Sequence, residues 1–183
     1  MKLYFVSKNP DKIQEMKLLF QQTVYSIKPF TDKNLFEIQT KDSEQLVHDK
    51  TVKAFSIIQK PLFVEHTYLK IDAIKGFPGG LTSSFWESFE ADLTCKHFSK
   101  SNATAETIIS YCDMKHIYTF NGSTAGSIST SPMGDSTFQW DTVFIPDGHT
   151  KTFAEIGTAE KNKFSMRATA VKKFIEHLEK NNG

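Results

Sequence analysis

The first thirty residues divide into apolar runs and polar connections that predict a strand, a helix and a second strand. Residues 2–6 are mostly apolar, as expected of a buried strand. After this run, Asn9 is a good helix N-cap and Pro10 a good first helical residue. Apolar residues then recur at helical spacing, which predicts a helix over residues 10–22, and residues 24–30 alternate as a second strand.

The rest of the chain continues with further helices and strands. Ser43 is the predicted N-cap of a long helix over residues 44–59. Residues 61–65 and 67–72 have the composition of strands around His66, and a glycine-rich turn follows. The elements predicted beyond that turn are helices over residues 85–98 and from 102 or 104 to 112, a hairpin of 117–120 with 125–130 joined through Asn121-Gly122, a strand over 142–145, and a last helix with apolar residues at 171, 174, 175 and 178.

The order of these elements predicts the fold class. Strand–helix–strand units give parallel strands, whereas hairpins give antiparallel ones, so their combination predicts an α/β protein with a mixed sheet. The chain has no repeat, low-complexity tract or linker, and its 183 residues are enough for one sizeable core. We therefore expect a single domain over residues 1–183.

Charge and cysteine content narrow the function classes. Lys and Arg number 22 and Asp and Glu 21, so the net charge is only +1, which argues against a general binder of nucleic-acid polymers or of membrane surfaces. The two cysteines, Cys95 and Cys112, are not in metal-type spacing and suggest a reducing compartment. The apolar runs are too short for a membrane span or a signal segment. We expect a cytoplasmic protein.

An aromatic cluster late in the chain is the first candidate for chemistry. Phe138, Gln139, Trp140 and Asp141 place two aromatic faces beside an amide and a carboxylate, a set that can stack on a planar ring and bind its edge. Cationic donors of the kind that hold phosphate oxygens follow at Lys161, Lys163 and Arg167. The alternative is an aromatic core strand followed by a solvated basic helix.

The first strand-to-helix corner is the second candidate. A helix N-terminus presents free backbone N–H groups and a positive dipole end to an anion. Lys8 and Lys12 add positive charge at the same place. The alternative is an ordinary corner with exposed lysines.

Taken together, these segments resemble the inosine triphosphate pyrophosphatase family, also called XTP/dITP diphosphatases. The resemblance covers nearly the whole chain in order, and the collinear set is specific although each motif alone is weak. The matching residues are Ser7, Asn9, Lys12 and Glu15; Glu37 and Gln39; Lys50 and Ala54; Glu65-His66-Thr67; residues 72–79; Phe138 to Thr142; residues 151–155; residues 160–162; and Ser165-Met166-Arg167.

The resemblance implies an elongated mixed central sheet with flanking helices and two lobes around a nucleotide-binding cleft. It implies hydrolysis of a purine nucleoside triphosphate such as ITP, dITP or XTP to the monophosphate and pyrophosphate. The implied cofactor is Mg²⁺, with Mn²⁺ as the alternative, because hard cations prefer carboxylate oxygens. The implied partners are the nucleotide and a second copy of the chain in a homodimer, with no membrane or nucleic-acid polymer.

The resemblance also assigns roles to residues. Glu37 and Glu65 would be metal ligands, and His66, Glu65 and Lys12 would be catalytic. The residues expected to bind substrate are Ser7, Asn9, Lys12, Lys50, Thr67, Phe138, Trp140, Asp141, Lys161, Ser165 and Arg167.

Two departures from the family pattern affect the expected catalysis and base recognition. His66 stands where the second carboxylate of an acidic pair is expected, and imidazole is a poor Mg²⁺ ligand. Met166 stands where a histidine is expected to help recognise the base. Two hypotheses follow: a working pyrophosphatase with altered metal or base preference, or a weak or inactive relative that binds a nucleotide or serves as a partner subunit. A third, an unrelated α/β binding module, requires the ordered motifs to be accidental.

Overall fold

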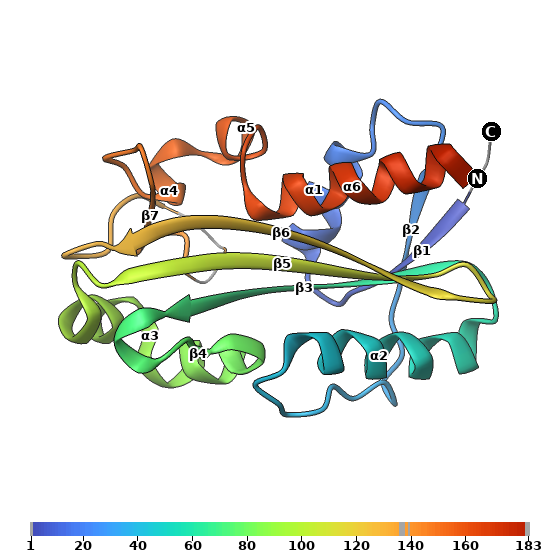
Figure 1. Ribbon diagram of the computed structural model, residues 1–183, viewed down its shortest axis with the longest axis horizontal. Coiled ribbons are helices and arrows are strands. Elements are labelled where there is room, and N and C mark those ends of the chain that lie inside the picture. The colour runs from blue at the N-terminus through green and yellow to red at the C-terminus, as the bar shows by residue number, and fades with distance from the viewer. Residues whose placement is uncertain (1, 136–137, 139, 182–183) are drawn as a thin grey trace.

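A mixed sheet of seven strands runs along the longest axis of the protein, with helices on both of its faces (Figure 1). The computed structural model describes residues 2–135, 138 and 140–181. The strands are β1 (Lys2–Val6), β2 (Ser26–Phe30), β3 (Leu62–Ile71), β4 (Phe77–Pro78), β5 (Asn102–Cys112), β6 (Ile117–Ile128) and β7 (Phe144–Pro146). The helices are α1 (Pro10–Leu19), α2 (Ser43–Ile58), α3 (Thr82–Phe98), α4 (Phe153–Ile156), α5 (Thr158–Lys161) and α6 (Met166–Asn181).

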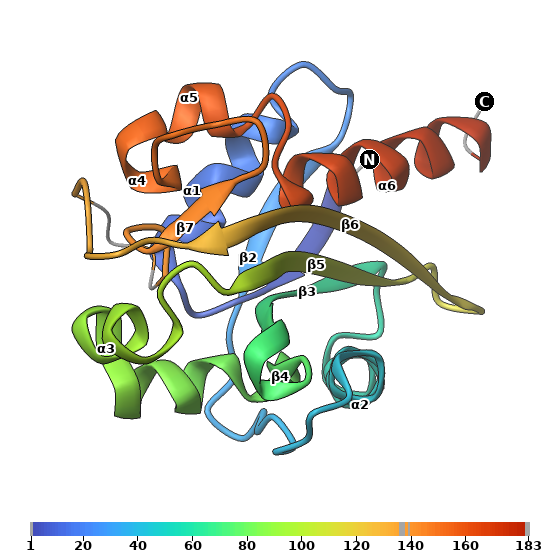
Figure 2. The same ribbon diagram turned by 60° about the vertical axis from the view of Figure 1, so that its left-hand side comes forward.

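The strand order is β2-β1-β3-β5-β6-β7, with β4 paired to the end of β3. β1 is parallel to both β2 and β3, whereas the pairs β3–β5, β5–β6 and β6–β7 are antiparallel. The prediction of a mixed central sheet with flanking helices is thus confirmed. Helices α1, α4, α5 and α6 cover one face, and α2 and α3 cover the other (Figures 1 and 2).

β3 is one continuous strand through the charged pair at its centre. It pairs with β1 on one side and β5 on the other, and nearly all of its side chains are buried. Side chains of a strand alternate between the two faces of the sheet, so Glu65 and Thr67 lie on one face and His66 on the other. Both faces are covered by helices, which explains why a strand with these polar residues is buried on both sides.

The predicted helix from residue 102 or 104 to 112 is wrong, because this segment is β5. Asn102 resembles a helix cap locally, but the segment contains Thr107, Ile108 and Ile109, and β-branched side chains favour strands. β5 pairs with β3 over residues 103–112 and with β6 over its full length. These long-range contacts decide its conformation.

The predicted turn at Asn121-Gly122 is also wrong, because both residues lie inside β6. The hairpin turn between β5 and β6 lies instead at residues 113–116, where the Asp113 carboxylate accepts hydrogen bonds from the backbone N–H of Lys115 and His116, both at 2.7 Å. Gly122 serves a different purpose. A Cβ atom there would meet the Met166 carbonyl oxygen at 2.0 Å, so the glycine allows α6 to pack directly on β6.

We expect Gly122→Ala to lower the free energy of unfolding by about 2 kcal/mol or more, because α6 must move away from the sheet to admit the methyl group. Chemical denaturation of the variant tests this. Ser123→Ala is the matched control, since Ser123 is exposed on the opposite face of β6 and its change should leave stability almost unaltered. Equal stability of the two variants would contradict the close approach.

Smaller differences concern helix ends. Asp42, not Ser43, is the N-cap of α2, and its side chain accepts hydrogen bonds from the N–H groups of Glu44 and Gln45, each at 3.0 Å. Asn9 caps α1 as predicted, with its side chain accepting from Lys12 N–H at 3.0 Å. Along the described chain, we find no helix with the length and apolar character required to cross a bilayer.

Candidate active site

The topology of the sheet creates a place for a site beside β1. The chain leaves β1 through α1 to reach β2 on one side, and it returns through α2 on the other face to reach β3 on the opposite side of β1. At such a reversal of strand order, neighbouring connections diverge and leave a crevice at the carboxyl ends of the strands. A cavity of about 480 Å³ lies there.

Many of the residues that the sequence analysis singled out line this cavity. They come from the β1–α1 corner, the segment after β2, helix α2, the middle of β3 and the segment before β7. The predicted site residues on its wall are Ser7, Asn9, Lys12, Glu37, Lys50, Glu65, His66, Thr67 and Phe138.

The N-terminus of α1 forms one wall. Asn9 closes the first turn, and its own backbone N–H donates to Ser7 Oγ at 3.2 Å. Pro10 occupies the first turn of the helix, where the lack of an N–H costs nothing. The positive end of the helix dipole and the ammonium of Lys12 therefore face the same cavity, an arrangement suited to an anion.

Glu65 connects Lys12 to a buried arginine. Its Oε2 lies 2.9 Å from Lys12 Nζ, and its Oε1 accepts from Arg167 Nε at 3.2 Å and from the Thr67 hydroxyl. Burial alone would raise the pKa of Glu65, but Lys12 and Arg167 hold that pKa well below the usual range for a carboxyl. Arg167 also bonds to Glu15. Glu65 is therefore ionised at neutral pH and fixes the position of Lys12.

The opposite face of β3 carries a second group at the cavity. Lys50 of α2 forms an ion pair with Glu37. His66 lies near both, and its Nε2 is buried without a hydrogen-bond partner among the residues that the structure describes. Burial lowers the pKa of His66 to about 4, and the charge of Lys12 acts in the same direction. The imidazole is therefore neutral near pH 7.

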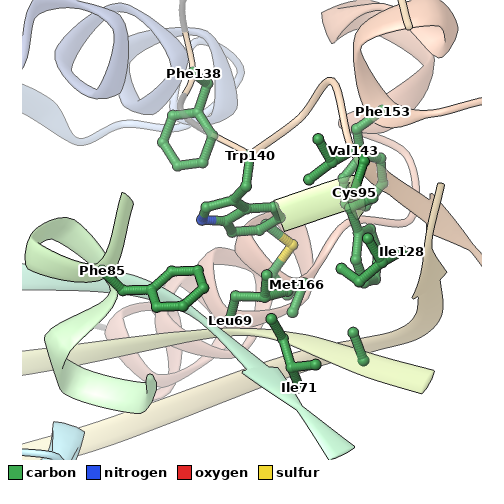
Figure 3. Packing of buried hydrophobic residues seen from close by; sticks show 13 residues of the cluster. Leu69, Ile71, Phe85, Cys95, Ile128, Phe138, Trp140, Val143, Phe153 and Met166 are labelled. Atoms are coloured by element: carbon green, nitrogen blue, oxygen red, sulfur yellow. The ribbon is translucent and has the colours of Figure 1, made fainter. Parts of the chain in front are cut away.

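Apart from Phe138, the residues expected to recognise a base lie behind the cavity wall. Trp140 is 0% exposed and packs edge-on against Phe138 at 5.5 Å between ring centroids (Figure 3). Asp141 pairs with Lys161 at 2.6 Å, and both are buried. In this structure Trp140 is a core side chain, as the alternative interpretation expected, but it lies in a turn and not in a strand. The solvated basic helix of that alternative is wrong, because Lys161 and Arg167 are buried. A role for it at a base stays a prediction.

Phe138 separates these residues from the cavity. Lys161 Nζ lies 4.9 Å from the centre of its ring and the Arg167 guanidinium 5.0 Å. Ser165 is fully buried near the start of α6, where its Oγ accepts from Ala168 N–H at 3.2 Å. All five of the remaining residues are buried and none is on the cavity wall: Trp140, Asp141, Lys161, Ser165 and Arg167. Met166 lies in the core cluster of Trp140, and Gln139 lies outside the described residues.

Sequence reasoning missed two residues that the fold brings to this region. Thr107 of β5 is 2.7 Å from the Thr67 hydroxyl and completes the polar layer around Glu65. Recognition of β5 as a strand paired with β3 would have found it. Phe36 lies on the cavity rim with 72% of its surface exposed. Only its position next to Glu37 of the sequence motif indicated a place near the site.

The carboxylates at the cavity fit one type of cation site. Both oxygens of Glu65 already face Lys12, Arg167 and Thr67, whereas Glu37 is partly open to solvent. Over the described ranges, no three acidic, histidine or cysteine side chains form a metal cluster. Mg²⁺ commonly binds through one or two carboxylates while keeping water and substrate phosphate oxygens. The residues present fit such a phosphate-borne cation held by Glu37, not a cage made of protein ligands alone.

Comparisons with known proteins agree on one family. A sequence model described as the Ham1 family matches residues 3–177. A dITP/XTP pyrophosphatase from Hyperthermus butylicus is 32% identical over 173 residues, which cover 93% of this chain and 90% of that protein. An inosine triphosphate pyrophosphatase from Saccharomyces cerevisiae is 33% identical over 193 residues, covering 98% and 96%.

Solved structures agree on the fold. A HAM1 protein from Coxiella burnetii superposes with a TM-score of 0.82 at 22% identity, covering 98% of this chain and 99% of that one. The Ham1 protein of Staphylococcus aureus gives 0.80 at 20% identity, covering 99% and 100%.

Proposed function

The chain belongs to the Ham1 family, and from this premise we propose that it hydrolyses purine nucleoside triphosphates to the monophosphate and pyrophosphate. The observation that carries the proposal is the convergence of the α1 N-terminus, Lys12 and Lys50 on one cavity that also contains the carboxylate of Glu37. Relatives named for dITP, XTP and inosine triphosphate support deaminated purines as the substrate class.

Binding of the polyphosphate is the first task of these residues. Phosphoryl transfer depends mainly on positioning and on neutralisation of charge. The backbone N–H groups at the start of α1 and the ammonium groups of Lys12 and Lys50 would hold phosphate oxygens from two sides. A divalent cation held by Glu37, Mg²⁺ or alternatively Mn²⁺, would supply further neutralisation of the phosphate charge.

His66 would act as the general base that activates the attacking water. A neutral imidazole can accept a hydrogen bond from water and take its proton, and His66 is the neutral base on the cavity wall. As the water oxygen bonds to phosphorus, its proton passes to the imidazole, the phosphoanhydride bond between the α- and β-phosphates breaks, and pyrophosphate leaves.

Base recognition would take place on the Phe138 side of the cavity. Phe138 is the member of the predicted base set that lines the cavity, with Asp141, Lys161 and Arg167 in the layer behind it. Met166 supplies no hydrogen bond to a base oxygen, which favours a broader base preference than a histidine would give.

One observation favours a second candidate function. The neutral imidazole of His66 stands where a carboxylate would otherwise contribute negative charge, so the same cavity would bind a nucleotide and hydrolyse it slowly or not at all. The protein would then be a nucleotide-binding relative or a partner subunit.

An assay of pyrophosphate release distinguishes the active pyrophosphatase from the inactive nucleotide-binding relative. We expect release with ITP, dITP or XTP in the presence of Mg²⁺ or Mn²⁺, and slower release with GTP and ATP. Calorimetric titration with a non-hydrolysable analogue measures binding separately. Binding without release for every pair of nucleotide and metal would favour the inactive relative, and absence of both would contradict the proposal.

Lys50→Met tests the contribution of α2 to phosphate binding. We expect KM to rise about tenfold or more, because a hydrogen bond to a charged group contributes roughly 1.5–3 kcal/mol. Lys53→Met is the matched control: it removes a lysine from the same helix that pairs with Asp49 and does not line the cavity. An equal rise in KM for both variants would mean that the net charge of α2, not a contact by Lys50, is responsible.

A further inference from the structure

Tyr68 stacks on His66 along the same face of β3. The two residues are separated by one position, so their side chains point to the same side of the sheet. Their ring centroids are 5.5 Å apart and their planes differ by 17°. His66 lines the cavity, whereas Tyr68 is not on its wall. The tyrosine is therefore the supporting ring behind the imidazole.

Tyr68 is itself held from several directions. Burial raises the pKa of its hydroxyl, Glu106 of β5 and Ser43 of α2 lie near enough to that hydroxyl to affect the same pKa, and only 7% of its surface is exposed. Lys70 lies over its ring at 5.6 Å and pairs with Glu106 at 2.9 Å. A ring that is buried and covered on one face by Lys70 has little freedom to turn.

The imidazole has fewer constraints of its own. Lys12, Glu65, Glu37 and Lys50 act on it through their charges, but its Nε2 has no hydrogen-bond partner in the described part of the chain. Charge alone does not set the plane of a ring, whereas an offset stack does. The stack with Tyr68 therefore constrains the plane of the His66 ring more directly than these charges do.

We propose that Tyr68 is a positioning residue that fixes the orientation of the His66 imidazole at the cavity wall. The kinetic part of this inference rests on the proposed function, in which His66 accepts the proton of the attacking water. Tyr68 does not touch the substrate and acts only through His66. A general base must keep its geometry to be effective, so loss of the stack should slow catalysis while leaving substrate binding unchanged.

The orientation is measured directly by NMR of protein with labelled histidine. His66→Asn identifies the His66 signals by their loss. Because removal of the tyrosine ring abolishes its ring current whatever the imidazole does, the orientation is followed by nuclear Overhauser effects between the His66 ring protons and its other neighbours. We expect these to change in Tyr68→Leu and to persist in Tyr68→Phe. Tyr68→Met serves as the second variant if the leucine variant does not fold. Unchanged Overhauser effects of His66 in a folded variant without the aromatic ring would overturn the proposal.

Kinetics test the consequence. Tyr68→Leu should lower kcat about tenfold with KM unchanged, and Tyr68→Phe should stay near the original rate, since a positioned general base contributes roughly 10²–10⁴-fold. A loss confined to KM, or no loss of kcat after the Overhauser effects of His66 have changed, would contradict the positioning role. An unaltered protein that releases no pyrophosphate would overturn the proposed function, while the NMR result still decides the orientation.

The chain offers a matched control in a second tyrosine–histidine pair. Tyr118 of β6 lies 4.3 Å from the ring of His177 on α6, and neither residue lines the cavity. Tyr118→Leu should move the His177 signals and leave kcat and KM unaltered. A similar fall in kcat in this control would show that loss of any tyrosine from the sheet slows the enzyme, which would contradict a specific role for Tyr68.

Discussion

Replacement of Glu65 by glutamine is expected to lower the free energy of unfolding by about 3 kcal/mol. Glutamine keeps the shape of the side chain but removes the negative charge between Lys12 and Arg167, both of which are largely or fully buried. Breaking a buried ion pair by removing one partner typically costs about 3–5 kcal/mol, because the remaining charge is left uncompensated. We expect the lower end of this range, since Glu15 still pairs with Arg167.

Urea denaturation of the two proteins at pH 7 measures this difference. Glu160→Gln is the matched control, because Glu160 pairs with Lys163 at 2.6 Å on the surface, where both side chains are more than half exposed. Its change should alter stability by no more than about 0.5 kcal/mol. An equal decrease in the free energy of unfolding for both variants would mean that the buried ion pairs of Glu65 stabilise the protein no more than a surface pair does.

The same substitution should change how stability depends on pH. The folded-state pKa of Glu65 lies below its ordinary value of 4.5, because Lys12 and Arg167 outweigh the effect of burial. Its contribution is therefore fully present above about pH 4.5 and is lost as pH falls through the folded-state pKa. The difference in stability between the original protein and Glu65→Gln should accordingly shrink as the solution is acidified below pH 4.5.

His66→Asp is expected to raise the Mg²⁺-dependent rate of pyrophosphate release by about 100-fold. Aspartate would place a second carboxylate beside Glu37 in a cavity that already contains Lys12 and Lys50, so its charge would be compensated. Oxygen ligands suit Mg²⁺ better than a neutral imidazole does. Loss of one charge-stabilising group of this kind typically costs about 10²–10³-fold in rate, and its restoration should recover a comparable factor.

His66→Asn is the control for His66→Asp, because asparagine has the same size as aspartate without its charge or a basic nitrogen. Its rate should fall below that of the original protein with either Mg²⁺ or Mn²⁺. Circular dichroism establishes that both variants are folded. An unchanged rate in His66→Asp would place residue 66 away from the cation and from the reacting phosphate.

Local sequence patterns were sufficient to predict the part of the site that is formed by residues close together in the chain. Asn9 and Pro10 specify the start of α1 through a cap and a fixed backbone angle, and the structure shows both. β1 and α2 follow from their apolar patterns in the same way. These features position Ser7, Lys12 and Lys50 at the cavity.

The remaining features depend on contacts between distant segments. The segment from Asn102 begins with a residue typical of helix caps, yet its pairing with β3 and β6 makes it a strand. Gly122 resembles part of a turn, but a glycine is needed there because the backbone of α6, some forty residues later, packs directly against it. The burial of Trp140 likewise depends on Phe138, Met166 and other members of its cluster. A single sequence contains no local record of such neighbours.

Lys12 and Lys50 reach the cavity from opposite faces of the sheet, one from α1 and the other from α2 (Figure 1). The two helices pack into separate apolar clusters with β3 between them. A polyanion bound by both lysines would therefore link α1 on one face of the sheet to α2 on the other. Binding of the ligand would then stabilise the packing of both helices on the sheet, and not only the residues that contact the ligand.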